Sequence, residues 1–354
     1  MAAIPIPTTR IPFQDAGEAN HFAINIRVPS GQTCNVLLDT GSTGVVLPAH
    51  FLHAGGDVTQ PVLPGVTGLG IPGSITYYPS GIVEQGSYYR VATLQAGESA
   101  PGQFAGTITD IVVLGTNSAN GYGMMGIGFG KPGNWGNGPA PSNPFLNFTG
   151  MATGSTYASY LLSRTGIWVG HAPEDLAQAF PSTTFGFQKL TGGPAAPCPN
   201  SGDWNRPAAA ITLTASGLSA ACTAANGAPG TVVLDTGIQS MMLEMALGAG
   251  WPDCLPGTTL TISVPGTGSA GPILTYSFAL AAGVSQTNGD ETTTGYPPAQ
   301  PSGPMAPTIV LPRLVGTPLA ANFVNTGINV LSATLYYFDA KLGQVGFAAC
   351  PAGS

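Results

Sequence analysis

Two aspartates occur in the same short motif in the two halves of this 354-residue chain. Asp39 lies in Asn-Val-Leu-Leu-Asp-Thr-Gly at residues 35–41, and Asp235 lies in Thr-Val-Val-Leu-Asp-Thr-Gly at residues 231–237. Two carboxyl groups that lie close together cannot both ionise easily, so they share a proton. One can then act as a general base on a water molecule while the protonated one donates to a carbonyl oxygen. Such a pair can hydrolyse a peptide bond without a metal ion or a covalent intermediate.

The residues around each aspartate predict how the carboxyl groups are positioned. An apolar, β-prone run precedes each motif and predicts a strand that ends at the aspartate. Gly41 and Gly237 permit a tight turn and a close approach that a Cβ atom would block. A single Asp-Thr-Gly motif is most often an ordinary turn in which the aspartate caps backbone amides. Two copies, each after an apolar strand, favour a shared site instead.

A second landmark follows each motif at nearly the same spacing. Gly126 lies in Met-Met-Gly-Ile-Gly at residues 124–128, and Gly327 lies in Asn-Thr-Gly-Ile at residues 325–328. The recurrence of motif and glycine in the same order predicts two homologous β lobes. Glycine (51) and proline (33) are abundant, which is typical of many short strands joined by turns. We therefore expect an all-β fold with a few short helices.

Local patterns refine this expectation. Residues 75–94 predict a β-hairpin, with Pro79-Ser-Gly as its turn. The pattern indicates a short helix around residues 157–162 and a polar, Pro-rich loop over residues 286–306. A strand begins at Thr184, and we place the boundary between the two lobes just before it, at residue 183.

Composition excludes several classes of partner. Charged residues make up 7% of the chain, against a usual value of about 25%. The net charge is −7 with nine Lys plus Arg and no basic cluster, so nucleic acid is not expected as a partner. No apolar run reaches the roughly 18 residues that a membrane-spanning helix needs. The N-terminal residues lack the charged segment and apolar core of a signal peptide.

Cysteine and histidine patterns predict neither a metal site nor a cofactor. The five cysteines are widely spread, with no CxxC motif and no Cys/His cluster. Cys34 precedes Asp39 in a predicted strand, and we expect it to be buried and unpaired. The other four cysteines can pair in three ways, which the sequence leaves open. The four histidines are scattered, and for each the sequence favours a solvated surface position: His21, His50, His53 and His171.

The motifs together resemble the pepsin-like, bilobal aspartic proteases over nearly the whole chain. In the first half the resemblance rests on residues 37–48, on Ile75-Thr-Tyr and on Met124 to Gly128; in the second it rests on residues 233–237 and on the segment from Gly327 to Ala348. The resemblance implies two β-barrel-like lobes, residues 1–183 and 184–354, with an inter-lobe sheet and a central cleft. It further implies an extracellular or periplasmic monomer that acts on polypeptides and needs no cofactor.

The resemblance also implies roles for individual residues. Asp39 and Asp235 would form the catalytic dyad, and Ser42 would hydrogen-bond the outer oxygen of Asp39. Tyr77 would be the tyrosine of a flap that closes over substrate, although the adjacent Tyr78 competes for this role. The residues supporting the dyad would be Thr40, Gly41, Ser42, Thr236 and Gly237.

Several positions depart from the family pattern. Ile238 follows the second motif where Thr or Ser is usual, so Asp235 lacks the hydroxyl that Ser42 offers Asp39; Ser240 is a candidate substitute. Val46 stands where many members carry a tryptophan that supports the flap tyrosine, and the flap turn at residues 78–81 is short. Asn325-Thr326 replaces the apolar pair before the second landmark glycine. These departures predict a divergent member with altered flap closure.

Three functions fit the sequence. The first is an acid endopeptidase that cleaves extended polypeptides bound as a strand under the flap. The second is a non-catalytic or weakly active peptide-binding or inhibitor-like protein of the same fold, which Ile238 and Val46 favour and the two aspartates oppose. The third is a β-rich structural protein with an incidental repeat, which explains the composition but not the paired landmarks.

Overall fold

The chain folds into two compact units that consist almost entirely of β-strands. The computed structural model describes residues 9–15, 22–117, 123–129, 143–151, 153–192, 204–215, 229–245, 251–268, 271–288, 291–313 and 321–350. The first unit comprises Met1–Pro181, Thr191–Asn205 and Tyr337–Gly343. The second comprises Ser182–Leu190, Arg206–Tyr336 and Gln344–Ser354.

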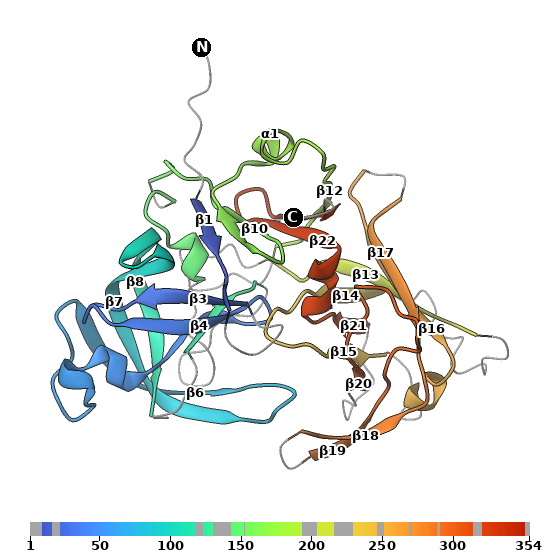
Figure 1. Cartoon of the computed structure of the whole chain (residues 1–354), viewed down its shortest axis with the longest axis horizontal. Coiled ribbons are helices and arrows are strands. Elements are labelled where there is room, and N and C mark those ends of the chain that lie inside the picture. Colours follow the sequence, from blue (N-terminus) through green and yellow to red (C-terminus); the bar gives the residue numbers. More distant parts are fainter. Residues whose placement is uncertain are drawn as a thin grey trace. The chain divides into compact units, whose positions relative to one another are not determined.

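The first unit contains an eight-stranded sheet in the order β2-β3-β4-β9-β5-β8-β7-β6 (Figure 1). An additional pairing between β3 and β7 closes this sheet on itself, as in a small barrel. The hairpin of β6 and β7 extends from it, as predicted for residues 75–94. The strands are β2 (Gln14–Asp15), β3 (Phe22–Arg27), β4 (Thr33–Asp39), β5 (Thr43–Pro48), β6 (Val66–Thr76), β7 (Val83–Ala100), β8 (Gln103–Thr116) and β9 (Gly123–Ile127).

Three more strands of this unit pair antiparallel: β1 (Thr9–Pro12) with β11 (Gly166–Val169), and β11 with β10 (Ser159–Leu162). The short helix expected around residues 157–162 is therefore wrong. All four residues of β10 are buried, and a short apolar run that is buried on both faces has no periodicity that separates strand from helix. The helical segments here are η1 (Ala49–Leu52), η2 (Ala54–Gly56), η3 (Pro144–Leu146), η4 (Pro173–Asp175) and α1 (Leu176–Ala179).

The second unit contains a seven-stranded sheet in the order β17-β16-β13-β14-β21-β15-β20 (Figure 1). Strand β12 pairs antiparallel with β23, and the 3-10 helices are η5 (Trp251–Cys254) and η6 (Ile328–Ser332). The strands are β12 (Gly186–Lys189), β13 (Ala208–Thr214), β14 (Pro229–Val233), β15 (Met241–Glu244), β16 (Thr259–Pro265), β17 (Pro272–Ala279), β20 (Val310–Pro312), β21 (Asn322–Asn325) and β23 (Gln344–Ala349). Strand β22 (Thr334–Asp339) begins in the second unit, and its residues from Tyr337 onward belong to the first.

A hairpin occupies much of the segment for which the sequence predicted a polar loop. Strand β18 (Val284–Asn288) pairs antiparallel with β19 (Glu291–Gly295). The pair begins two residues before the predicted loop of residues 286–306 and covers its first part. The prediction of a loop was wrong over this part because the threonine-rich strands lack apolar alternation. Threonine nevertheless favours strands, since its branched side chain suits a pleated surface.

Alternation of apolar and polar residues explains the longer strands. In β16, Leu260, Ile262 and Val264 are fully buried while the residues between them are partly exposed. This period of two places one face of a strand in the core. The all-β prediction is thus confirmed.

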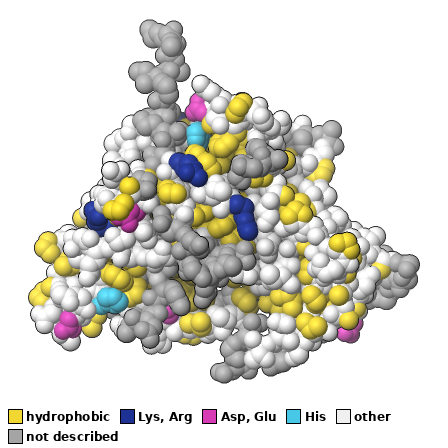
Figure 2. Space-filling view, in the orientation of Figure 1, with side chains coloured by type: hydrophobic (Ala, Val, Ile, Leu, Met, Phe, Trp, Pro, Cys, Tyr) yellow, Lys and Arg dark blue, Asp and Glu magenta, His cyan; other side chains and the backbone are white. Residues whose placement is uncertain are grey.

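The outside of the described residues carries few charges. On the face shown in Figure 2, Lys, Arg, Asp and Glu are isolated among hydrophobic and uncharged side chains. None of the described helices is long and apolar enough to cross a membrane. Within the same residues, no group of three or more His, Cys, Asp or Glu side chains is arranged to hold a metal ion.

Candidate active site

Asp39 is placed by three neighbouring strands of the first unit. Strand β4 ends at Asp39, and β9 lies between β4 and β5, parallel to β4 and antiparallel to β5. In this register Gly126 of β9 is opposite Asp39 on one side and Gly44 on the other. The turn from β4 to β5 must therefore pass over the end of β9. This places Asp39 where the parallel strands β4 and β9 both end.

Two donors hold the Asp39 carboxyl group. The Gly41 N–H donates to Asp39 Oδ1 at 2.6 Å, and the Ser42 hydroxyl donates to Oδ2 at 2.5 Å. The Ser42 hydroxyl also lies 3.7 Å from Met124 Sδ of β9, a second acceptor. Asp39 is 7% exposed, so these bonds act on a largely buried group. The Ser42 bond is the one that the family resemblance implies.

Gly126 of β9 and Gly128 just after this strand leave room for this turn. A Cβ atom at Gly126 would lie 2.6 Å from Ser42 Oγ and 2.7 Å from the backbone nitrogen of Thr43. A Cβ atom at Gly128 would lie 2.3 Å from the Thr40 carbonyl oxygen. The turn is tied to β9 by the Thr43 hydroxyl, which donates to the Gly128 carbonyl at 2.8 Å. Glycine is thus required by close packing against the aspartate turn.

The second unit repeats the arrangement around Asp235. Strand β21 lies between β14 and β15, parallel to β14 and antiparallel to β15. Val233 and Asn325 are the last pair of these two strands, and Asp235 and Gly327 each follow two residues later. The Gly237 N–H donates to Asp235 Oδ1 at 2.8 Å, as Gly41 does for Asp39. Asp235 is also 7% exposed.

The outer oxygen of Asp235 has a donor that the sequence did not reveal. The Asn325 side-chain amide donates to Asp235 Oδ2 at 2.6 Å. Its own oxygen accepts the Gly327 N–H at 3.1 Å, and the side chain is 4% exposed. Ile238 offers no hydroxyl in the turn, and the Asn325 amide takes the place of the hydroxyl that Ser42 gives Asp39. The donor comes from β21 instead of from Ser240 in the turn.

At Gly327 both the backbone conformation and the close packing require glycine, whereas at Gly126 only the packing does. Its φ of +65° lies in the left-handed region, which strains any residue with a Cβ atom. A Cβ atom there would also lie 2.5 Å from the Ser240 carbonyl oxygen. Both landmark glycines therefore contact the turn that follows their own aspartate.

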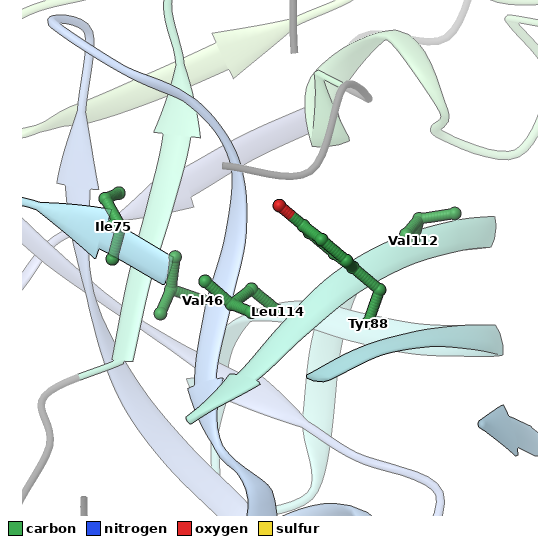
Figure 3. Close-up of a cluster of buried hydrophobic side chains, with 5 residues drawn as sticks. All are labelled: Val46, Ile75, Tyr88, Val112 and Leu114. Carbon is green, nitrogen blue, oxygen red and sulfur yellow. The ribbon is translucent and has the colours of Figure 1, made fainter. Parts of the chain in front are cut away.

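The β6–β7 hairpin presents Tyr77 and Tyr78 differently. The Tyr77 N–H donates to the Ile82 carbonyl at 2.9 Å and closes the turn. Tyr77 is half-buried, and its ring packs against the buried cluster that contains Val46 and Ile75, drawn in Figure 3. Tyr78 is 60% exposed. Tyr77 therefore packs toward the interior, against the cluster that contains Val46. Val46 is the position at which the resemblance implies a tryptophan.

Three polar atoms lie on this otherwise apolar face without a hydrogen-bond partner among the described residues. They are the Tyr77 hydroxyl, Glu84 Oε2 and the Thr116 hydroxyl. Glu84 is opposite Ile75 in the hairpin, hence on the same face as Tyr77. Burial raises the pKa of Tyr77, and the charges of Glu84 and Asp39 raise it further. Burial also raises the pKa of Glu84, although nearby Thr116 offsets part of this.

The remaining predicted residues have mixed outcomes. Thr40 and Thr236 are buried, at 6% and 0% exposed. Cys34 is buried and forms no disulfide, as predicted, and burial raises the pKa of its thiol to about 11. His171 is 7% exposed, so its predicted surface position was wrong; burial lowers its pKa. Cys198, Cys222 and His21 lie outside the described residues.

Comparison with known proteins yields a structural likeness alone. No protein-family model and no curated protein matches the sequence. Among solved structures, the chain is similar to the aspartic proteinase from Irpex lacteus. The TM-score is 0.53 at 13% sequence identity, and the alignment covers 98% of each chain. At this identity the likeness shows the fold, which is the all-β, pepsin-like fold.

Two residues of the site escaped sequence reasoning. Asn325 was noted as a replacement of an apolar residue, but its partner follows only from the β14–β21 register. Glu84 lies in the return strand of the hairpin, and its proximity to Tyr77 depends on hairpin pairing. In both cases the available signal was a polar residue at a position where the pattern predicts burial.

Proposed function

We propose that the chain is an aspartic endopeptidase of the pepsin-like kind, with Asp39 and Asp235 as its dyad. The observation that carries this proposal is the duplicated support of two buried carboxyl groups. Asp39 ends β4 and Asp235 follows the last residue of β14 by two, each accepts a glycine N–H and a second side-chain donor, and a landmark glycine packs against the turn that follows each aspartate. In this proposal the lobes are residues 1–183 and 184–354, and each contributes one carboxyl group to the dyad.

The chemistry follows from two carboxyl groups that share one proton. The ionised carboxylate removes a proton from a water molecule, whose oxygen attacks the peptide carbonyl carbon. The protonated carboxyl group gives its proton to the carbonyl oxygen, so that charge does not accumulate. The glycine N–H bonds hold both groups in place. Burial strengthens these hydrogen bonds because the surroundings have a low effective dielectric constant.

Substrate would lie as an extended strand beneath the β6–β7 hairpin, with Tyr77 above the Asp39 side. A polypeptide in this position forms backbone hydrogen bonds, while alternate side chains enter apolar pockets. We further propose an extracellular or periplasmic monomer. The scarcity of charged side chains is compatible with acid, since few groups change their charge as pH falls.

Cleavage of an unfolded protein tests the proposal. We expect the purified chain to hydrolyse such a substrate at about pH 3–5, where a dyad holds one proton. Asp39→Asn and Asp235→Asn should each abolish cleavage while leaving the fold intact. Asp57→Asn serves as a matched control, since the exposed Asp57 side chain accepts the Thr59 N–H and hydroxyl within its own turn. Cleavage that survives both dyad substitutions would refute the proposal.

The peptide-binding alternative is favoured by one observation, the Tyr77 hydroxyl that is buried without a partner beside Val46. If this alternative holds, a peptide binds at acid pH and stays intact during long incubation. Detection of cleavage products that depend on Asp39 decides against it.

A further inference from the structure

The two carboxyl groups receive their second hydrogen bond from different kinds of side chain. The same two positions are available in each unit, but each unit uses a different one of them. Met124 precedes Gly126 by two residues in β9, and Asn325 precedes Gly327 by two residues in β21. Ser42 and Ile238 each follow their aspartate by three residues. In the first unit the second donor is the turn residue, and the strand residue is apolar. In the second unit the turn residue is apolar, and the strand residue is the donor.

The partners also differ in what they can do with a proton. Ser42 can donate to Asp39, or it can turn its hydrogen toward Met124 Sδ and accept a hydrogen bond from a protonated Asp39. The Asn325 amide has no such freedom, because the Gly327 N–H occupies its oxygen. It therefore presents only N–H to Asp235 Oδ2. A donor that cannot accept favours the ionised form of its partner.

We infer that Asn325 is a positioning residue that keeps Asp235 ionised, so that Asp235 is the base and Asp39 carries the proton. The inference rests on the proposed function and assigns roles within it. Asp235 takes a proton from water, and the water oxygen forms a bond to the peptide carbonyl carbon. Asp39 gives its proton to the carbonyl oxygen, whose π bond breaks, and the product is a neutral tetrahedral diol.

The test removes the Asn325 amide and then gives Asp235 a hydroxyl donor in the turn, as Ser42 does for Asp39 in the first unit. Asn325→Leu should lower kcat about 10- to 100-fold with little change in KM, because the lost bond acts on the reacting carboxylate. Its acid limb of kcat against pH should move up by about one pH unit, since Asp235 then binds a proton more readily. Adding Ile238→Ser should recover at least about tenfold of the loss. Asn35→Leu, at an exposed asparagine of β4, is the control.

A second variant, which has nearly the same shape as asparagine, tests the inference even if Asn325→Leu does not fold. Asn325→Asp keeps the shape, donates while it is protonated, and repels Asp235 once it ionises. Its activity should therefore be retained best at the lowest pH and lost earlier than that of the unmodified chain as pH rises. A purely structural role predicts equal loss at every pH.

A second readout separates this inference from the proposed function. Titration of ¹³C-labelled aspartate followed by NMR reports the Asp235 carboxyl group whether or not the chain cleaves peptides. In Asn325→Leu its midpoint should move to higher pH by about one unit. If the unmodified chain cleaves nothing but this midpoint moves, the proposed function fails and the positioning role stands. An unchanged midpoint, or unchanged kcat and acid limb, overturns the inference.

Discussion

Ser42→Ala is the most direct perturbation of the support around Asp39. The substitution removes a hydroxyl that donates to Asp39 Oδ2 at 2.5 Å and leaves the Gly41 N–H bond to Oδ1 in place. The carboxyl group should thus stay near its position but lose one of its two donors. Because Ser42 is only partly buried and alanine fits within its volume, we expect little change in the free energy of unfolding.

The size of the effect follows from the bond that is lost. Asp39 becomes charged as it gives its proton to the carbonyl oxygen, and a hydrogen bond to a charged group contributes about 1.5–3 kcal/mol. At about 1.36 kcal/mol for each factor of ten, this corresponds to a loss of about 10- to 150-fold in kcat. KM should change little, since the carboxyl group acts on the reacting water and carbonyl more than on substrate binding.

The assay is steady-state cleavage of a peptide across the acid pH range, with thermal unfolding measured in parallel. Ser30→Ala is the matched control, because the exposed Ser30 hydroxyl bonds only the neighbouring Gln32 among the described contacts. A kcat within twofold of the unmodified chain, with unfolding unchanged, would show that Ser42 does not support a catalytic carboxyl group.

Three further predictions concern the surroundings of the dyad. Gly126→Ala should lower activity at least about tenfold and stability by about 1–3 kcal/mol, because its Cβ meets the backbone of the aspartate turn; Gly271→Ala, whose Cβ meets no atom within 4 Å, should change neither. Glu84 has a raised folded-state pKa, so its stabilising contribution is present at low pH and is lost as pH rises through that value; Glu84→Gln should therefore raise the melting temperature at pH 7 more than at pH 3. Tyr77→Phe should keep stability equal or higher, because it deletes a buried hydroxyl without a partner, whereas Tyr77→Ala should lower both stability and kcat/KM.

The sequence predicts the parts of the fold that local patterns determine. The apolar run before Asp39 became β4, and residues 75–94 became the β6–β7 hairpin. The repeated glycines predicted two similar arrangements, since close packing at Gly126 and the left-handed backbone at Gly327 both exclude a side chain. These features depend on a few adjacent residues, so they can be read without the tertiary structure.

The features that were missed depend on pairing between distant segments. Asn325 supports Asp235 only because β21 runs parallel to β14 in a particular register. β10 is a strand because it pairs with β11, and its apolar run by itself fits a helix equally well. His171 is buried by the packing around it, and a lone histidine carries no local signal of burial.

The distance between the Asp39 and Asp235 carboxyl groups, measured in a crystal structure at acid pH, tests the central claim most directly. A shared proton requires that the nearest oxygens lie about 3 Å apart, within hydrogen-bond reach. We predict this distance, with Ser42 and Asn325 on the outer oxygens. Carboxyl groups that lie more than about 6 Å apart, beyond a direct or water-bridged contact, would contradict the dyad and with it the proposed function.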